Sequence, residues 1–596
     1  MLSVRGGFGP GAWENTRARG GKRKTSVTAL AVMLAMLSAL AHAQTPPPVP
    51  LPPAPNAFVE EQRQQDRERA LRRQQERAFH NPARPELRAE ARQLPDDEPS
   101  CLRVDRLVLA GERAEDFQWA LAAAAGEVGS DDPRGRCLGP RGIDIVMARL
   151  QRALVARGYI TTRVLAAPQE LHQGTLTLTL IPARVAAIRF AGGSESRTSL
   201  AAAIPARAGD LIDVRDIEQG LENFKRAPTA EADVQIDVSS LAGARPGDSD
   251  LVVNYAQRFP LRTTLSLDDS GTHATGKRQA GATLAWDNPL GLNDLFYVSL
   301  NHDAFNHPGQ GTRGQTVHYS LPWGYWLASA TASQGKYHQS VHGAYETYVY
   351  AGESASAEVK VSRLIYRDQR RKTTLALRAF RRSAHNFVDD EEIWVEQRAT
   401  AGWELGLAHR EFIGEATLDA NLAGRRGTGA FGALHAPEEN FGDGTARVRI
   451  ATAELGVNAP FQLGAQKLRY SGLWRAQWSP GALTPQDRFG IGGRYTVRGF
   501  DGESSLLGDR GWLLRNDVGW AVGESGAELY LGIDHGQVAG PSTRQLEGRH
   551  LSGGVIGLRG ARMGLSYDFF VGAPIDKPEG FRTAGTTAGF NLNYSF

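Results

Sequence analysis

Arg498 and Asp534 are charged residues in segments that otherwise consist mostly of glycine, aliphatic and aromatic residues. Arg498 lies in "GGRYTVRGF" and Asp534 lies in "LYLGIDHG". A guanidinium and a carboxylate that meet form a charge-assisted, bidentate hydrogen-bonded pair, which can fix one segment of a chain against another. The alternative is that Arg498 occupies an exposed loop tip and that Asp534 is simply solvated. The two possibilities require different surroundings for these residues.

The segment around Asp534 alternates with the period of a β-strand. Period two places four residues on an apolar face, namely Ala527, Leu529, Leu531 and Ile533. The opposite face then carries Glu528, Tyr530, Gly532, Asp534 and Gly536. If the apolar face meets lipid, Asp534 points into the lumen of a barrel, where its carboxylate requires a cation. Arg498 is a candidate for that cation if its loop folds inward.

One glycine motif suggests a different chemistry. Residues Gly309 to Gly314 read "GQGTRG", which matches the dinucleotide-binding pattern G-x-G-x-x-G. No helix follows it, so the motif lacks the helix N-terminus that would hold a phosphate, and we expect a flexible loop. His302 and His307 lie nearby, but they are a weak indication of a metal site. The sequence contains no P-loop, H-E-x-x-H motif or convincing nucleophile elbow, so we predict no enzyme activity, no catalytic residues, no cofactor and no metal.

The composition excludes two broad classes of protein. The 596 residues carry 68 Lys and Arg against 65 Asp and Glu. The resulting net charge of +3 is too small for a protein that coats nucleic acid, and we predict no nucleic-acid partner. After residue 41, no apolar run approaches the ~18 residues of a membrane-spanning helix, which argues against a bundle of such helices.

The N-terminus has the features of a secretory signal peptide over residues 1–43. Basic residues precede the apolar stretch Val27–Ala41, and Ala41-His42-Ala43 matches a cleavage site. A transmembrane anchor is the weaker alternative, because the apolar stretch is short. In the oxidising compartment reached by export, Cys101 and Cys137, the only two cysteines, are expected to form a structural disulfide.

The amino-acid composition and patterning change several times after the predicted signal peptide. Residues 44–56 are proline-rich and should be extended. Residues 57–80 hold strong helix formers with almost no apolar face, so this helix is either solvated or lodged in a water-filled cavity. A second linker covers residues 81–100. Two compact mixed α/β units are predicted at 101–182 and 183–257, with a similar order of strands and helices.

Beyond residue 258, helical patterns fade and alternating segments dominate. Examples are "LRTTLSLDDS", "GLSYDFFVG" and the C-terminal "TAGFNLNYSF". In an exported chain this pattern is typical of an outer-membrane β-barrel, although a secreted all-β adhesin would alternate in the same way. At ~21 residues for a strand with its loop, residues 258–596 predict about 16 strands, and the spacing also accepts about 14 or 18.

Several motifs together resemble one known family. They are "GGRYTVRGF", "LYLGIDHG", "DNPLGLNDLFYVSL" from Asp287, "YSLPWGYW" from Tyr319 and "GAPIDKPEGF" from Gly572. The chain thus resembles a TpsB-type two-partner secretion transporter, from the haemolysin and filamentous-adhesin exporter branch of the outer-membrane insertase superfamily. The segment "CLGPRGIDIVMARLQRALVARGYITTRV" from Cys137 is similar to the first POTRA domain of that family.

The resemblance implies a transmembrane antiparallel β-barrel of about 16 strands over residues 258–596. Two periplasmic α/β POTRA domains (101–182 and 183–257) and an N-terminal plug helix (57–80) would precede it. A sixth outer loop, about residues 485–512, would fold back into the lumen. By resemblance, the loop motif Val497, Arg498, Gly499 and Phe500 meets the wall motif Gly532, Asp534 and Gly536, with Arg498 paired to Asp534. Only some members share the two cysteines, which should affect stability more than function.

The implied function is the export of one large β-helical exoprotein of the haemolysin, adhesin or contact-dependent toxin type. Export would run from the periplasm to the cell surface without ATP. The expected partners are this cargo, bound by the POTRA domains, and the lipid of the bacterial outer membrane, and the barrel is expected to be monomeric. The alternative is an insertase that assembles other outer-membrane barrels, against which the two POTRA units and the separate plug helix argue. A passive porin would have no obvious use for POTRA domains.

Overall fold

The computed structural model describes residues 57–75, 93–96, 98–126, 129–169, 174–194, 197–305, 308–343 and 345–596. The predicted signal peptide (1–43), the proline-rich segment (44–56) and residues 81–92 of the predicted second linker lie outside these residues. Within the described ranges, no helix has the length and apolar character needed to cross a membrane.

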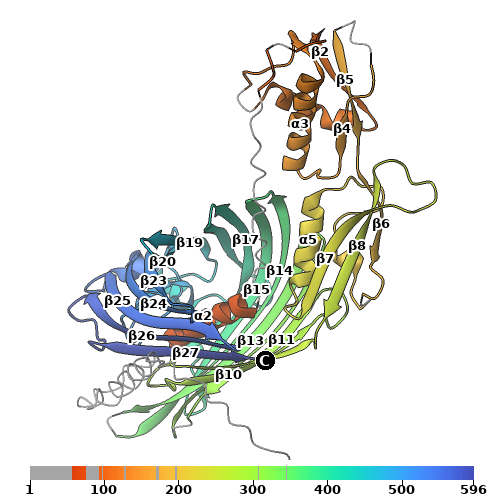
Figure 1. Ribbon diagram of the computed structural model, residues 1–596. Coiled ribbons are helices and arrows are strands. Elements are labelled where there is room, and N and C mark those ends of the chain that lie inside the picture. Colours follow the sequence, from red (N-terminus) through yellow and green to blue (C-terminus); the bar gives the residue numbers. More distant parts are fainter. Residues whose placement is uncertain are drawn as a thin grey trace, which may run out of the picture. The chain divides into compact units, whose positions relative to one another are not determined.

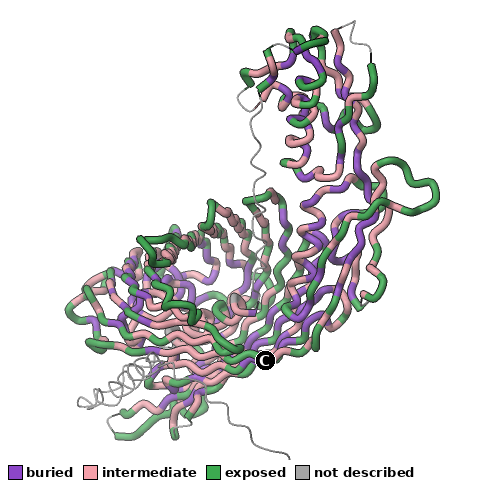
Figure 2. Tube along the Cα trace, in the orientation of Figure 1, coloured by how far each residue is buried: buried purple, intermediate pink, exposed green. Residues whose placement is uncertain are grey.

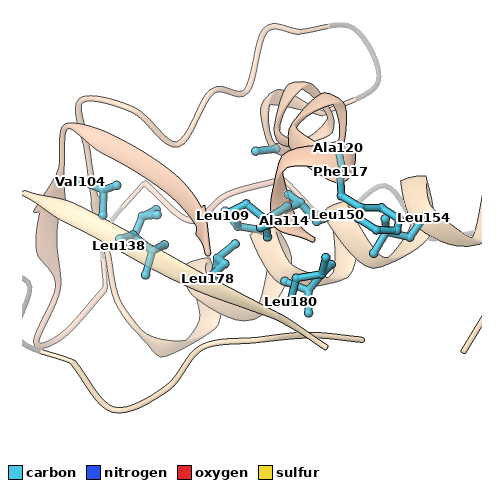
Figure 3. Packing of buried hydrophobic residues seen from close by; sticks show 14 of the residues in the cluster. Val104, Leu109, Ala114, Phe117, Ala120, Leu138, Leu150, Leu154, Leu178 and Leu180 are labelled. Carbon is cyan, nitrogen blue, oxygen red and sulfur yellow. The ribbon is translucent and has the colours of Figure 1, made fainter. Parts of the chain in front are cut away.

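The first α/β unit packs two helical segments on a three-stranded sheet. Its elements are β1 (Leu102–Val104), β2 (Arg106–Gly111), η1 (Ala114–Ala125), β3 (Arg136–Leu138), α3 (Pro140–Ala156), β4 (Arg163–Leu165) and β5 (Thr175–Ile181). The sheet order is β2-β5-β4, and β2 lies parallel to β5. The alternating run Arg103–Gly111 is divided between β1 and β2, because β1 pairs with β3 instead of β5. Figure 3 shows Phe117, Leu150 and Leu154 of the helical layer packed near Leu178 and Leu180 of β5.

The second α/β unit repeats a helix-on-sheet arrangement. Its elements are β6 (Arg184–Phe190), α4 (Leu200–Ala203), α5 (Val214–Lys225), β7 (Ala230–Val238) and β8 (Asp248–Gln257). The sheet order is β6-β8-β7, with β6 parallel and β7 antiparallel to β8. Asp213 caps α5, because its side chain accepts a hydrogen bond from the amide of Arg215. Phe224 of α5 packs against Tyr255 of β8 in the core.

The rest of the chain forms a closed antiparallel barrel with 16 long strands (Figure 1). These strands are β9 (Leu261–Asp268), β10 (Gln279–Asp287), β11 (Leu295–Asp303), β12 (Gln310–Trp323), β13 (Trp326–His342), β14 (Thr347–Arg367), β15 (Arg371–Val388), β17 (Arg398–Ile413), β18 (Ala416–Thr428), β19 (Arg449–Leu463), β20 (Gln466–Trp478), β23 (Arg510–Val522), β24 (Ala527–Ala539), β25 (His550–Arg562), β26 (Leu565–Asp576) and β27 (Thr587–Ser595). A short piece, β16 (Glu391–Glu392), pairs antiparallel with the end of β15. The barrel closes where β27 pairs with β9, with Tyr594 opposite Leu265.

Burial alternates along the barrel strands, as Figure 2 shows by its alternating colours. Leu531 and Ile533 are 58% and 56% exposed on the outside, whereas Tyr530 and Asp534 on the same strand are 2% and 1% exposed. The predicted division of residues 527–536 into two faces is therefore correct. An apolar outer face and a polar inner face are the pattern that a lipid-embedded barrel requires.

A helix and a long loop occupy the lumen. The helix, α2 (Ala57–Gln75), makes side-chain contacts with β10, β14 and the long loop from inside the ring of strands. The loop joins β20 to β23 over residues 479–509 and contains the short hairpin of β21 (Phe489–Ile491) and β22 (Leu506–Gly508). We call it loop six. Its bounds differ from the predicted 485–512, because the β20–β23 ladder already pairs Gln477 with Gly511.

Candidate functional site in the barrel lumen

Loop six is anchored on the inner wall by an apolar cluster. Ile491, Val497 and Phe500 of the loop are buried with Leu513, Val538, Leu551 and Phe581. Gly499 has φ +93, and a Cβ there would lie 2.5 Å from the carbonyl oxygen of Ala573 on β26. Glycine therefore lets the loop backbone approach the wall at the residue that follows Arg498.

Arg498 and Asp534 meet at the centre of this contact. Arg498 Nε lies 2.7 Å from Asp534 Oδ2, and its Nη2 lies 2.7 Å from Oδ1. The backbone N–H of Arg498 donates a further bond to Oδ2 at 2.9 Å. The side chains are only 5% and 1% exposed. The bidentate pair is thus enclosed by protein, and Arg498 is not at an exposed loop tip.

A second carboxylate, Asp517 on β23, completes the coordination of Arg498. Its Oδ1 accepts from Arg498 Nη2 at 2.5 Å, and its Oδ2 accepts from Arg559 Nη1 at 3.1 Å. Arg559 Nη2 also lies 2.6 Å from Glu528 Oε1. Arg515 Nε stands 3.8 Å from Asp534 Oδ2. The inner part of this network holds three arginines and three carboxylates, namely Arg498, Arg515 and Arg559 with Asp517, Glu528 and Asp534.

The glycines of the wall motif make room for loop six. A Cβ at Gly532 would lie 2.5 Å from Asp517 Oδ1 and 2.7 Å from Arg498 Nη2. A Cβ at Gly536 would lie 2.9 Å from a methyl carbon of Val497 and 3.0 Å from one of Ile491. Any larger residue at these positions would displace the loop motif from the wall. Gly532, Asp534 and Gly536 therefore form the complementary surface for Val497 to Phe500.

Polar contacts hold α2 in the remaining space. Arg67 donates to Gln279 of β10 and to Ser270, both at 2.9 Å, and Arg72 Nη1 lies 2.7 Å from Glu358 Oε1 of β14. Gln62 donates to the carbonyl of Arg488 at 3.0 Å, and Arg63 donates to the carbonyl of Gly502, both in loop six. A cavity of about 470 Å³ remains between the helix, loop six and the wall. A polar lumen explains why the helix has no apolar face.

The second α/β unit is attached to the barrel through α5. Asn223 donates to the carbonyl of Gly324 at 2.8 Å, in the turn between β12 and β13. Arg367 Nη1 donates to Gln219 and to Glu222 at 2.8 Å, and Tyr325 donates to Asp216. These contacts join α5 to the turns at one end of the barrel.

The pKa values of two carboxylates of α5, Asp216 and Glu222, are shifted in opposite directions. Burial raises the pKa of Asp216 to about 6, although the hydrogen bond from Tyr325 acts against this change. Burial would also raise the pKa of Glu222, but the neighbouring cations Lys372 and Arg367 outweigh it and hold that pKa below its usual value.

Two interactions attach the chain before β1 to the first unit, namely a disulfide and the hydrogen bonds of Glu98. Cys101 and Cys137 are bonded, with their Cα atoms 5.2 Å apart. Glu98 accepts hydrogen bonds from the amides of Gly139 at 2.6 Å and of Arg141 and Gly142 at 3.0 Å, at the start of α3. A carboxylate there satisfies amides that have no partner within the helix. Both interactions tie the chain preceding β1 to the first unit.

The expectation of a flexible loop at Gly309–Gly314 was wrong. Residues from Gln310 onwards belong to β12, and only Gly309 lies in the preceding turn, with φ +81. Gly314 faces inward, where a Cβ would lie 2.4 Å from Asn301 Oδ1. Gly311 belongs to the other face of β12, paired with His338, and a Cβ there would lie 2.7 Å from the His338 ring. His302 lies on β11, and His307 is outside the described residues. Among the described residues, no group of three or more His, Cys, Asp or Glu is arranged to hold a metal ion.

Asp517, Arg515 and Arg559 are residues of the network that the sequence analysis did not identify. Asp517 and Arg515 lie on the inner face of "RGWLLRNDVGW", and Arg559 lies in "GLRGAR". The sequence did contain a signal for them: all three are charged residues on the inward face of strands next to the strand of Asp534. The strand pairing that places Arg515 opposite Asp534 is a long-range property.

Known proteins share this architecture. A family model described as haemolysin secretion/activation protein ShlB/FhaC/HecB matches residues 247–560, and two POTRA models match 120–183 (ShlB-type) and 184–237. Outer membrane transporter CdiB-2 of Burkholderia pseudomallei (strain 1026b) is 34% identical over 95% of this chain and 99% of its own. Hemolysin transporter protein HpmB of Proteus mirabilis is 24% identical over 68% of this chain and 71% of its own. The structure of CdiB from Acinetobacter baumannii superimposes with a TM-score of 0.78 at 28% identity, covering 91% of this chain and 100% of that one.

Proposed function

The chain belongs to the ShlB/FhaC/HecB family of haemolysin secretion/activation proteins, and we propose that its cargo is one large β-helical exoprotein. The protein is an outer-membrane transporter of the two-partner secretion type, with POTRA domains in the periplasm. One observation carries the proposal: the barrel lumen is filled by a polar helix and a loop held through side chains, and neither is part of the wall. Such contents can move aside while the wall stays intact.

The cargo belongs to the haemolysin, adhesin or contact-dependent toxin type, and its folding outside the cell provides the driving force. The periplasm holds no ATP, and the sequence contains no recognisable nucleotide site. We therefore infer that transport does not use ATP. Folding of a β-helix at the surface prevents its return through the pore.

The POTRA domains bind the cargo while it is unfolded. In each sheet, each of the two outer strands has a neighbour on one side only. The unpaired edge suits the addition of an extended segment by main-chain hydrogen bonds. β7 is such an edge, and Glu231, Asp233 and Asp237 are exposed along it. The proposed division of the chain is 101–182 and 183–257 for the two POTRA domains and 258–596 for a monomeric barrel, with residues 57–80 as the plug.

Loop six is the element whose position controls the pore. The pair of Arg498 and Asp534 fixes the loop on the wall, and loop six in turn contacts α2 through Arg488 and Gly502. When cargo arrives, α2 leaves its sites on β10 and β14. The disulfide Cys101–Cys137 stabilises the first POTRA domain and takes no part in transport.

The experiment that tests the function compares a deletion strain with the same strain complemented by the wild-type gene. The adjacent reading frame should encode a very long exported β-helical protein, whose amounts at the cell surface and in the medium are measured. Export should vanish on deletion and return with the wild-type gene. If export persists while other outer-membrane proteins decline, the chain is an insertase of outer-membrane barrels and the proposal is wrong.

A further inference from the structure

The outer face of β10 to β13 carries a groove that transport through the lumen does not use. It has a volume of about 670 Å³ and is lined on the outside by small, polar and basic side chains. Ala280 and Ala282 leave space beside Leu300, and Gln315 donates to Gln334 at 2.9 Å across its floor. His302, Arg313 and Lys336 also line it.

Strand register places the three basic residues in one row. His302 lies opposite Arg313, and Arg313 lies opposite Lys336. They share the outer face with Val317 and Leu300, which are 42% and 54% exposed. Side chains alternate between the two faces of a strand, and Val317 is four residues from Arg313 while Leu300 is two residues from His302. The row therefore faces the lipid side of the wall.

The row lies at the extracellular boundary of the apolar band. The turn between β12 and β13 contacts α5 of the periplasmic POTRA domain, so Trp323 and Trp326 mark the periplasmic end. Arg313 and Lys336 each lie about ten residues from these tryptophans. At ~3.4 Å per residue and a tilt of about 40°, this separation is roughly 26 Å along the membrane normal, against an apolar band of about 25 Å.

Of the three basic residues in the row, Arg313 is the one without a neighbouring carboxylate among the described residues. Lys336 pairs with Glu353 on β14, and His302 Nδ1 lies 3.1 Å from Asp303 Oδ1. Arg313 is exposed and has no hydrogen-bond or ion-pair partner among the residues that the structure describes. At the boundary of the apolar band an arginine on the outer face costs only about 0–1 kcal/mol, and its guanidinium lies at the level of the lipid headgroups, whose phosphate oxygens it can bind in bidentate fashion.

We propose that this groove binds the phosphate-bearing headgroup of a glycolipid in the outer leaflet. A phosphate pairs with Arg313 and Lys336, and the pair of Gln315 and Gln334 donates to sugar or linker oxygens. An acyl chain lies along Leu300 and the two alanines. The outer leaflet supplies phosphorylated glycolipid at the depth of the row, whereas a phospholipid of the inner leaflet would meet only the tryptophan end.

The test uses the purified full-length protein in nanodiscs and lipopolysaccharide as the probe. Binding is measured by native mass spectrometry and by titration, for the wild type and for the double variant Arg313→Gln/Lys336→Gln. Arg363→Gln is the matched control, because Arg363 is also exposed on the outer face but lies beside Trp326 at the periplasmic end. Mobility of unheated samples on gels verifies that each variant is folded.

The proposal expects the double variant to bind lipopolysaccharide at least about tenfold more weakly, while Arg363→Gln binds like the wild type. Dephosphorylated lipopolysaccharide should bind the wild type as weakly as intact lipopolysaccharide binds the double variant. Equal binding by wild type and double variant would overturn the proposal. So would full competition by millimolar inorganic phosphate, which would make the groove a site for free phosphate and not for a lipid. None of these outcomes depends on secretion.

Discussion

The carboxylate of Asp534 holds both the side chain and the backbone of Arg498, with the guanidinium at 2.7 Å and the amide at 2.9 Å. One wall residue therefore fixes the position and the orientation of loop six at this point. Both groups are buried, so the pair differs from a solvent-exposed ion pair, which would be worth only about 0–1 kcal/mol. Removal of one partner of a buried pair costs roughly 3–5 kcal/mol where the other charge is left without compensation. Arg515 and Arg559 lower this cost here, because they remain beside Asp534 and Asp517.

Arg498→Ala is expected to give a folded barrel that has lost most secretion. The strand ladders remain, and Arg515 and Arg559 stay beside the two carboxylates, but loop six loses its anchor. Exoprotein in the medium is measured together with the amount of folded barrel. Arg562→Ala, at an exposed position at the end of β25, is the control and should secrete normally. Secretion at the wild-type level by Arg498→Ala would refute the role given to the pair.

Gly532→Ala should also impair secretion, although it changes no charge. The new methyl group would lie 2.5 Å from Asp517 Oδ1 and 2.7 Å from Arg498 Nη2, so the guanidinium must move. Gly554→Ala is the matched control, because its Cβ would come no nearer than 3.3 Å to any neighbour, a side-chain carbon of Ile575. Export and protease access to loop six are the two measurements. If both glycine variants behave alike, the fit between loop and wall is not what limits export.

Arg67→Ala/Arg72→Ala is expected to release α2 from the wall and to raise ion conductance in planar bilayers. Each arginine bonds a residue of the barrel, Gln279 and Glu358 respectively. Arg69→Ala is the control, since Arg69 is 51% exposed and pairs with Asp66 on the same helix. A double variant with unchanged conductance would show that the remaining contacts to loop six suffice to hold α2.

The contact between α5 and the barrel should weaken as pH rises from about 4 to about 7. Asp216 has a folded-state pKa of about 6, above its ordinary 3.8, so its stabilising contribution is complete below about pH 3.8 and is lost as pH rises through 6. Asp216→Asn should remove this dependence, because the amide stays neutral. Proteolysis between the second POTRA domain and the barrel is followed across the pH range. Asp237→Asn, exposed on β7, should retain the dependence of the wild type.

Cys101→Ser/Cys137→Ser should destabilise the first POTRA domain and leave export nearly unchanged at low temperature. A disulfide across 36 residues contributes roughly 3–4 kcal/mol in the chain-entropy model. Thermal unfolding of the full chain and exoprotein levels at two temperatures are measured. Loss of export at the lower temperature, with the domain still folded, would contradict a purely structural disulfide.

Period-two patterning was sufficient to predict which residues face the lumen. Asp534 and Tyr530 lie inside and Leu531 lies outside, because a lipid-embedded strand leaves little freedom in its side-chain pattern. The inward position of Arg498 followed only from the family resemblance. Its loop is held by contacts with residues far away in the sequence, such as Ala573 and Leu551, and local composition carries no information about them.

The failure at Gly309–Gly314 has a similar cause. Glycines in a short motif suggest a loop, but Gly314 lies opposite Gly335, and both face the lumen next to α2. A Cβ at residue 335 would lie 2.0 Å from Gln64 Oε1, so glycine leaves the space that the Gln64 side chain of the helix occupies. The wall must lack a side chain where the helix lies against it, and this requirement arises only in the assembled barrel. A sequence motif read by itself could not reveal it.

The attachment of α5 to the barrel turns has a mechanical consequence. A polypeptide that folds on the outside pulls on the part still held in the periplasm, and an equal reaction acts on whatever holds it. Asn223 and Arg367 connect the second POTRA domain directly to the ends of β12 and β14. In the proposed mechanism, where this domain holds the cargo, the force passes through these contacts into the ring of strands, and the domain keeps its position at the pore entrance.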